Sequence, residues 1–197
     1  MPARRKKEKV RVFTIGHSTH PILEFVELLK THGVKRVIDV RTIPRSRHNP
    51  QFNREELGPA LRAGGIAYTH LKKLGGLRHS KKDSINRGWR NASFRGFADY
   101  MQTPEFEAGL DRATKLAATK PSALMCAEAV PWRCHRSLIA DALTVRRVPV
   151  EHIISGSRTQ PHKITPFALV RGKRITYPDE TRRRSRLMPS RRGRKEA

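Results

Sequence analysis

Cysteine is scarce in this chain, which has only Cys126 and Cys134 among its 197 residues. Two thiols are too few for the disulfide framework of a small secreted protein, so we interpret them as free thiols, ligands or a redox pair. Long apolar runs are also missing, because no stretch approaches the roughly 20 residues that cross a bilayer. The N-terminal segment lacks the apolar centre of a secretory signal. These absences favour a soluble, cytoplasmic protein with no membrane contact.

Acidic side chains are few as well. Asp and Glu number 17 against 42 Lys and Arg, which gives a formal net charge of +25. Residues 1–11 hold six basic side chains and residues 181–197 hold eight, so residues 12–180 still carry 28 basic against 15 acidic ones. A folded body with this charge attracts phosphates, and we predict a partner that is nucleic acid or a phosphorylated ligand. A cationic surface that only keeps the protein soluble is the alternative.

The phosphate-binding signatures of common nucleotide enzymes are missing too. The chain has neither a Walker loop nor a Gly-x-Gly-x-x-Gly motif, which argues against ordinary nucleoside triphosphate or dinucleotide binding. A phosphatase-like thiol loop places an arginine after five intervening residues, whereas Arg133 follows Cys126 after six. Structural zinc ligands come in closely spaced pairs, but seven residues separate the two thiols here. We therefore assign no metal, keep a Cys/His site only as a weak alternative, and leave the cofactor unknown.

Apolar strands alternate with amphipathic helices along the body of the chain. This alternation predicts an α/β fold of three layers, Rossmann-like, with a mostly parallel sheet of about five strands. We expect a basic N-terminal arm over residues 1–11, a single α/β domain over 12–180 and a disordered Arg-rich tail over 181–197. The expected strands lie near residues 10–15, 36–40, 66–71, 123–126 and 148–154, and the expected helices near 21–32, 54–63, 94–101, 104–119 and 134–146.

Reactive side chains gather where these predicted strands end. In open α/β sheets, ligands bind outside the carboxyl ends of the strands. The densest group follows the strand that ends at Cys126, where Glu128, Cys134, His135 and Arg136 come in quick succession. A helix that begins beside them offers free backbone N–H groups and a positive dipole end, which attract anions and favour a thiolate. The sequence therefore predicts a site at this junction.

Each candidate site residue also has a simpler structural interpretation. Cations near a helix start can lower the pKa of a thiol from about 8.5 to as low as about 3.5–7.5, but a free cysteine is also a common small core residue. Glu128 is a candidate acid or base, or a solvated loop residue. The candidate catalytic residues are Cys126, Glu128, Cys134, His135 and His17, and the candidate anion-binding residues are Arg41, Arg45, Arg47, Arg136 and Ser18.

A long loop between residues 72 and 93 combines several cations with an aromatic side chain. Cations that follow phosphates and an aromatic ring that stacks on a base are typical of nucleic-acid contact, which we predict here. The alternative is that the tryptophan forms a hydrophobic lid over the sheet. The candidate contact residues are Arg78, Lys81, Lys82, Arg87, Trp89 and Arg90.

Short motifs are spread in order along most of the body. They include Ile15-Gly-His-Ser18, Asp39-Val-Arg41, Leu74-Gly-Gly-x-Arg78, and Cys126-x-Glu128 with Cys134-His-Arg136. Together they resemble the family called domain of unknown function 488, from about Val12 to Pro178. The resemblance implies one α/β domain with Rossmann-like layering and marks the motif residues as the site. It brings no established reaction.

Three functional hypotheses follow from these patterns. The leading one is an enzyme that acts on nucleic acid or a phosphorylated nucleoside, with a Cys thiolate, proton transfer by Glu128 and His17, and phosphate held by arginines. The second is a nonenzymatic nucleic-acid-binding module in which the thiols only pack. The third is a metal or redox sensor that uses both cysteines.

Overall fold

A six-stranded sheet in the order β3-β2-β4-β1-β5-β6 forms the centre of the computed structural model, which describes residues 10–179. The first five strands are parallel and β6 is antiparallel at one edge, which confirms the predicted mostly parallel α/β sheet. Nearly all of the predicted basic arm and the whole predicted Arg-rich tail lie outside the described residues. The strands are β1 (Val12–Gly16), β2 (Arg36–Asp39), β3 (Ala67–His70), β4 (Ser122–Cys126), β5 (Val150–Ile153) and β6 (Thr159–Pro161), with a separate hairpin of β7 (Leu169–Arg171) and β8 (Arg174–Thr176).

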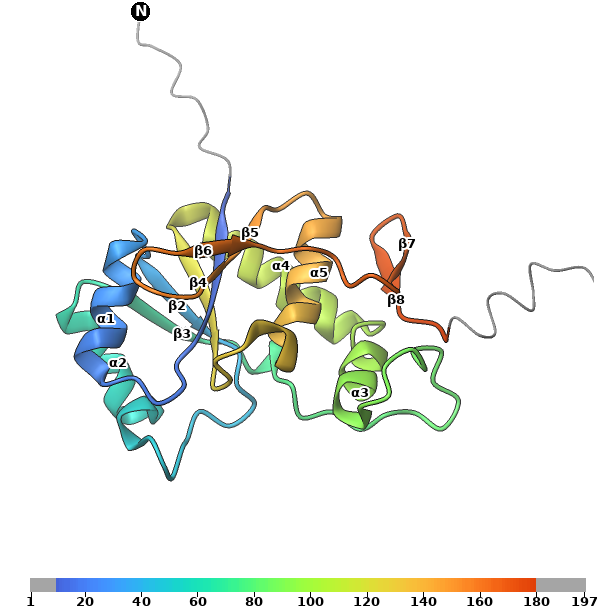
Figure 1. Ribbon diagram of the computed structural model, residues 1–197, viewed down its shortest axis with the longest axis horizontal. Coiled ribbons are helices and arrows are strands. Elements are labelled where there is room, and N and C mark those ends of the chain that lie inside the picture. Colours follow the sequence, from blue (N-terminus) through green and yellow to red (C-terminus); the bar gives the residue numbers. More distant parts are fainter. Residues whose placement is uncertain (1–9, 180–197) are drawn as a thin grey trace, which may run out of the picture.

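Helices cover both faces of this sheet (Figure 1). Alternate residues of β1 point to opposite faces, so that Phe13 and Ile15 pack in the core under α1 and α2, while Val12 packs in the core under α3, α4 and α5. Within residues 10–179, no helix is long and apolar enough to cross a membrane. The helices are α1 (Ile22–Thr31), α2 (Arg54–Ala63), α3 (Ala92–Tyr100), α4 (Pro104–Thr119) and α5 (Arg136–Val145), with short 3₁₀ turns η1 (Pro50–Phe52), η2 (Lys72–Leu74) and η3 (Pro131–Arg133).

Local signals explain where several helices begin and end. At the start of α4, the Thr103 hydroxyl oxygen accepts a hydrogen bond from the Phe106 backbone N–H, and Pro104 occupies the first turn. Gly33 and Gly65 follow α1 and α2 with positive φ values of 68° and 75°, a backbone region that favours glycine. The bounds expected for α2 and α4 agree with the structure.

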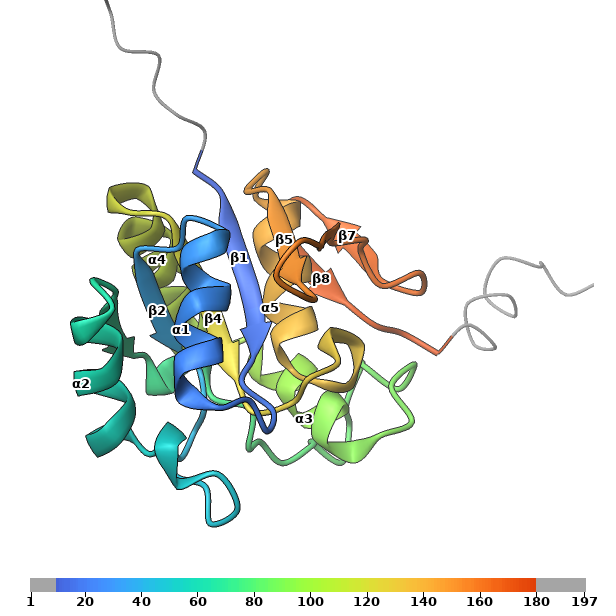
Figure 2. The same cartoon turned by 60° about the vertical axis from the view of Figure 1, so that its left-hand side comes forward.

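The long loop before α3 is fastened by one buried carboxylate. Asp99 on α3 accepts hydrogen bonds from the Lys81 backbone N–H (2.9 Å), the Ser84 hydroxyl (2.7 Å) and the Asn86 side-chain amide (2.8 Å). The side-chain oxygen Oδ1 of Asn86 in turn accepts from the Tyr177 backbone N–H at 2.9 Å. The loop is therefore held between α3 and the C-terminal segment, at the edge of the molecule (Figure 2).

A chain of buried hydrogen bonds anchors the segment that follows β5. The Thr14 hydroxyl donates to His152 Nδ1 (2.6 Å), His152 Nε2 to His162 Nδ1 (3.0 Å), and His162 Nε2 to Asp141 on α5 (2.7 Å). Asp141 also accepts from the Tyr177 hydroxyl at 2.8 Å. Burial lowers the pKa of His152 to about 4, so this ring is neutral at pH 7. The chain ties the C-terminal segment to the centre of the sheet.

We expect Asp141→Ala to lower the free energy of unfolding by about 3–5 kcal/mol, because it leaves buried donors of His162, Thr165 and Tyr177 without their acceptor, at about 1–3 kcal/mol each. Urea unfolding followed by circular dichroism measures the change. The control is Asp111→Ala on the exposed side of α4, which should shift the unfolding free energy by less than about 0.5 kcal/mol. Equal effects of the two substitutions would contradict the anchoring role of Asp141.

Candidate functional site

A cavity of about 350 Å³ opens at the carboxyl ends of the parallel strands. Its walls come from the segments after β2, η2 and β4 and from the start of α3. Four of the five candidate catalytic residues line it, and His17 does not. The lining residues are Cys126, Glu128, Cys134 and His135, the arginines Arg41, Arg45 and Arg133, and Thr42, Ile43, Gly76, Leu77, Ser93, Phe94 and Ala127.

Cys126 carries the more acidic of the two thiols in the cavity. Its Sγ is buried at the end of β4 and accepts a hydrogen bond from Arg136 Nη1 at 2.7 Å. Burial opposes ionisation, but a hydrogen bond from Cys134 and the charge and hydrogen bond of Arg136 outweigh it and lower the pKa of Cys126 to about 7. A large fraction of Cys126 is therefore thiolate at neutral pH.

Cys134 is the protonated member of the pair. Its hydrogen bond to Cys126, its burial and the charge of the Cys126 thiolate all raise the pKa of the Cys134 thiol well above its usual value. The Cys134 Sγ also lies 3.5 Å from Nδ1 of His135, whose Nε2 donates to the Val40 carbonyl at 3.1 Å. Burial lowers the pKa of His135 to about 4, so this imidazole is neutral and positions Cys134.

Arg136 serves the interior of the protein, although the sequence predicts it as a phosphate ligand. The residue is 1% exposed. Besides Cys126, its guanidinium donates to the carbonyl oxygens of Glu128 and Ala129, the latter at 2.7 Å. Its Nε is buried and has no hydrogen-bond partner among residues 10–179. Because the group is buried and occupied on one side by this loop, we interpret Arg136 as support for Cys126, and its role as a phosphate ligand stays a prediction.

The first motif of the chain braces the same loop. A Cβ on Gly16 would lie 1.8 Å from the Glu128 carbonyl oxygen, so only glycine lets the loop cross the end of β1. The backbone N–H groups of His17 and Ser18 donate to the carbonyl oxygens of Cys126 and of the residue after it, both at 2.9 Å. Ser18, a predicted anion ligand, does not line the cavity and contributes to the site through its backbone.

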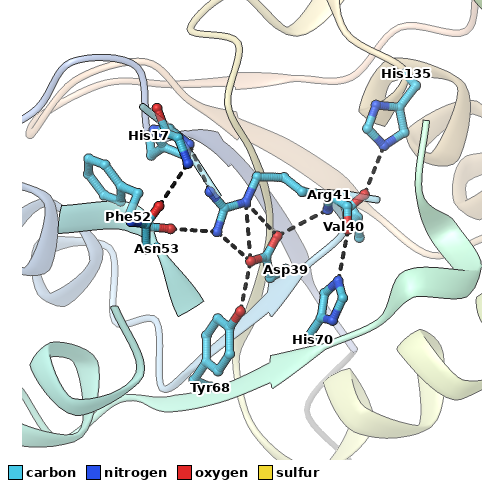
Figure 3. Close-up of polar contacts among 10 residues, drawn as sticks. His17, Asp39, Val40, Arg41, Phe52, Asn53, Tyr68, His70 and His135 are labelled. Carbon is cyan, nitrogen blue, oxygen red and sulfur yellow. Dashed lines mark hydrogen bonds and ion pairs between the residues drawn. The ribbon is translucent and has the colours of Figure 1, made fainter. Parts of the chain in front are cut away.

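A buried polar cluster forms the support behind Arg41 (Figure 3). Asp39 accepts from Arg41 Nη2 at 2.6 Å and from the Tyr68 hydroxyl at 2.8 Å, and Arg41 also donates to the Phe52 carbonyl at 2.8 Å. Arg41 Nη1 lies 3.3 Å from His17 Nε2, and burial lowers the pKa of His17 to about 4. His17 is therefore neutral and turned toward Arg41, so the geometry does not support the predicted role of His17 in proton transfer.

Two arginines at the cavity keep guanidinium groups available for a ligand. Arg45 is exposed, and its nearest carboxylate, on Glu55, is 4.0 Å away. The exposed Arg133 guanidinium has no hydrogen bond or ion pair with any described residue. Sequence patterns involve Arg133 only through the phosphatase-like spacing, although an arginine directly before Cys134 is itself a sign of an anion-binding site. Arg47 is exposed but does not line the cavity.

The tryptophan of the long basic loop is partly buried. Trp89 packs against Phe94, Phe167 and Tyr177, with ring centroids 4.7, 5.0 and 5.6 Å away, which agrees with the alternative of hydrophobic packing. The exposed tryptophan is Trp132, beside the cavity-lining Arg133. Of the other predicted contacts, Arg78 lies over the Tyr100 ring at 3.6 Å, whereas Lys81, Lys82, Arg87 and Arg90 are exposed.

Both cysteines are free thiols. Within the part of the chain that the structure describes, no group of three or more His, Cys, Asp or Glu side chains is arranged to hold a metal ion. The Cys/His metal alternative therefore has no preformed ligand set of this kind there.

A family model described as "Domain of unknown function DUF488" matches residues 21–143. The match is more than half of the chain and contains every residue that lines the cavity, from Arg41 to His135. The Gly16-His17-Ser18 motif and the C-terminal anchor at His152 lie outside the matched residues. No curated protein and no solved structure matches the chain.

The buried histidines give the protein an acid-sensitive stability. Burial lowers the pKa values of His17, His135 and His152 to about 4, from an unfolded value near 6.5. Between these two pKa values the unfolded chain binds more protons than the folded chain, so acid favours unfolding. The contribution of the three neutral histidines to the unfolding free energy is therefore complete above pH 6.5 and is lost as the pH falls toward 4. We expect the unfolding free energy, measured by urea titration, to fall by several kcal/mol between pH 7 and 4.5.

Replacement of one of these histidines tests whether they cause the loss of stability at acidic pH. His152→Gln should be less stable at pH 7 but should show a shallower loss of unfolding free energy below pH 6.5. A curve as steep as that of the wild type would assign the acid sensitivity to other groups.

Proposed function

Since the chain belongs to the family described as domain of unknown function DUF488, a description that names no reaction, we propose its function from the cavity itself. The protein is a cysteine-dependent enzyme that acts on a phosphorylated nucleoside, free or within a nucleic acid. The single observation that carries this proposal is the acidic thiol of Cys126 in a cavity that also holds the exposed arginines Arg45 and Arg133.

Cys126 is the nucleophile of the proposed reaction. A thiol with a pKa of about 7 is both substantially ionised at neutral pH and still strongly nucleophilic. Arg136 fixes the sulfur through a 2.7 Å hydrogen bond, so the attacking atom is already oriented before a ligand enters. The neutral imidazoles of His17 and His135 take no part as proton acceptors in this step, because each is engaged in hydrogen bonds that hold the site together.

Cys134 supplies the proton that the attack requires. When the Cys126 sulfur forms a bond to an electrophilic carbon of the nucleoside, the bond from this carbon to its leaving group breaks, and the electron pair of that bond stays on the leaving atom. The charge on Cys126 is then lost, and with it one cause of the raised pKa of Cys134, while the nearby Arg136 charge still favours a Cys134 thiolate. The Cys134 proton can therefore pass to the displaced electron pair.

Glu128 completes the cycle in this proposal. Its exposed carboxylate lines the cavity, where it can accept a proton from a water molecule that attacks the same carbon. The bond between carbon and the Cys126 sulfur breaks, its electron pair returns to sulfur, and the thiolate is restored. The proton balance closes when Glu128 passes its proton to Cys134 through solvent.

The thiol pair also supports a second candidate function, a redox sensor. Cys126 and Cys134 are joined by a hydrogen bond, so their sulfur atoms are already neighbours. A hydroperoxide would oxidise Cys126 to a sulfenic acid with release of an alcohol, and attack by Cys134 would then form the disulfide and release water. Mass spectrometry after treatment with a stoichiometric hydroperoxide tests this candidate, because the disulfide lowers the mass by two hydrogens and protects both thiols from alkylation.

We expect Cys126 to react with iodoacetamide with a midpoint near pH 7, because alkylation follows the thiolate. Rates at a series of pH values are read from peptide mass spectra. Cys134→Ala removes the hydrogen bond from Cys134 and should raise the midpoint, while Cys134→Ser keeps a donor and should raise it less. Cys126→Ser is the control that shows no product at this position. A wild-type midpoint near 9 would contradict an activated thiol.

A trapping experiment tests the enzymatic proposal directly. We expect incubation with a panel of 5′-nucleoside monophosphates and short oligonucleotides to yield a converted product or a covalent adduct, and we expect Cys126→Ala to lose at least about 100-fold of that activity. Ser93→Ala, which removes a hydroxyl of the cavity wall and leaves Cys126 in place, should lose far less. Liquid chromatography and intact-protein mass spectrometry are the readouts. Absence of product and adduct across the whole panel would overturn the proposal.

A further inference from the structure

We propose that the substrate of this cavity is presented as a single strand of nucleic acid, with one base stacked on Trp132 and the adjacent backbone held by Arg133 and Arg45. The next nucleotide of the strand enters the cavity. The inference rests on the proposed function for what happens inside the cavity, but the binding itself needs no reactive thiol.

Trp132 is an exposed ring on a fixed support. The residue is 63% exposed, whereas the other tryptophan, Trp89, is packed in an aromatic cluster. Trp132 sits in the turn η3, where Pro131 is buried and where backbone hydrogen bonds run from Arg133 to Val130 (3.2 Å) and from Cys134 to Pro131 (3.0 Å). Because the turn is already formed, a base that stacks on the indole orders little additional backbone.

Two cations lie where the phosphates of such a strand would pass. Arg133 is the residue after Trp132 and lines the cavity, and Arg45 lines it from the segment after β2. The Arg133 guanidinium has no partner among the described residues, and the Glu55 carboxylate is only loosely paired with Arg45 at 4.0 Å. A phosphate therefore displaces no strong internal ion pair when it binds these two groups.

The entrance of the cavity suits an unstacked base. Ile43 and Leu77 are large apolar side chains that remain exposed while they line the cavity, and the partly buried Phe94 lines it as well. A base that leaves the strand would cover this apolar surface, whereas the bases of a duplex have their faces already stacked. A free mononucleotide would reach the cavity but would leave Trp132 uncovered.

Tryptophan fluorescence distinguishes these ligands, because the chain has only two tryptophans. In the Trp89→Phe variant of the full chain, a 15-mer of deoxythymidine should quench the remaining Trp132 emission, and a 5′-mononucleotide should not. In Trp132→Phe, the same oligonucleotide should leave Trp89 emission nearly unchanged. Quenching by the mononucleotide alone would overturn the inference in favour of a free nucleotide as ligand.

Affinity for a fluorescein-labelled deoxythymidine 15-mer, measured by anisotropy, provides the second arm. Trp132→Ala should weaken binding about 5- to 100-fold, the range for one stacked base. The control is Leu23→Ala, which truncates a 78% exposed apolar residue on α1 and should bind as the wild type does. The double variant Arg45→Ala/Arg133→Ala should bind the oligonucleotide more weakly, and its affinity should depend less steeply on salt concentration. The full chain is used throughout, so residues outside 10–179 contribute equally to every variant.

The outcomes separate this inference from the proposed function. If the wild-type protein binds the 15-mer but converts nothing, only the enzymatic step is refuted. Unchanged affinity of Trp132→Ala, or equal affinity for a duplex of the same length, overturns the single-strand inference and leaves the enzymatic step standing.

Discussion

The hydrogen bond from Arg136 to the Cys126 sulfur is the interaction on which the site depends. One buried guanidinium contacts this sulfur and the carbonyl oxygens of Glu128 and Ala129, so the same group sets the charge of the thiol and the course of the loop after β4. A buried cation without partners would be strongly destabilising, and the thiolate with two carbonyl dipoles offsets that cost. Ionisation of Cys126 and folding of the loop therefore stabilise each other.

Internal hydrogen bonds and ring contacts also hold other charged and titratable side chains at and behind the cavity. Asp39 holds Arg41, and His17 is stacked on Phe52 with ring centroids 4.1 Å apart, so these charged and titratable groups are part of the packed interior. Gly76 lies so close to His135 that a Cβ would be 2.5 Å from its Nδ1, which lets the loop after η2 close over the imidazole. Arg45 and Arg133 lack close internal partners of this kind, so theirs are the guanidinium groups of the cavity that are left for an external anion.

Periodicity and turn residues were sufficient to predict the fold and the edge of the sheet where the cavity lies, because strand and helix patterns depend on local sequence. The bounds of α2 and α4 and the position of Cys126 at a strand end agree with the structure. The direction in which a side chain points could not be predicted from these local patterns. Whether His17 faces the cavity depends on how the loop after β4 crosses Gly16, and the hydrogen bonds of Asp141 join segments far apart in sequence. The same limit explains why the sequence predicts Trp89, in the basic loop, as the nucleic-acid contact, although Trp132 is the exposed tryptophan.

The distribution of charge resolves an apparent conflict in the proposed function, which brings a phosphorylated ligand close to a thiolate. Two negative groups in one small cavity repel, and a phosphate close to Cys126 would raise the pKa of the thiol. Arg136 is buried against the sulfur, whereas Arg45 and Arg133 are exposed at the cavity. A phosphate of the proposed ligand would be neutralised locally by the exposed arginines, and the Cys126 thiolate would keep the partner that stabilises it.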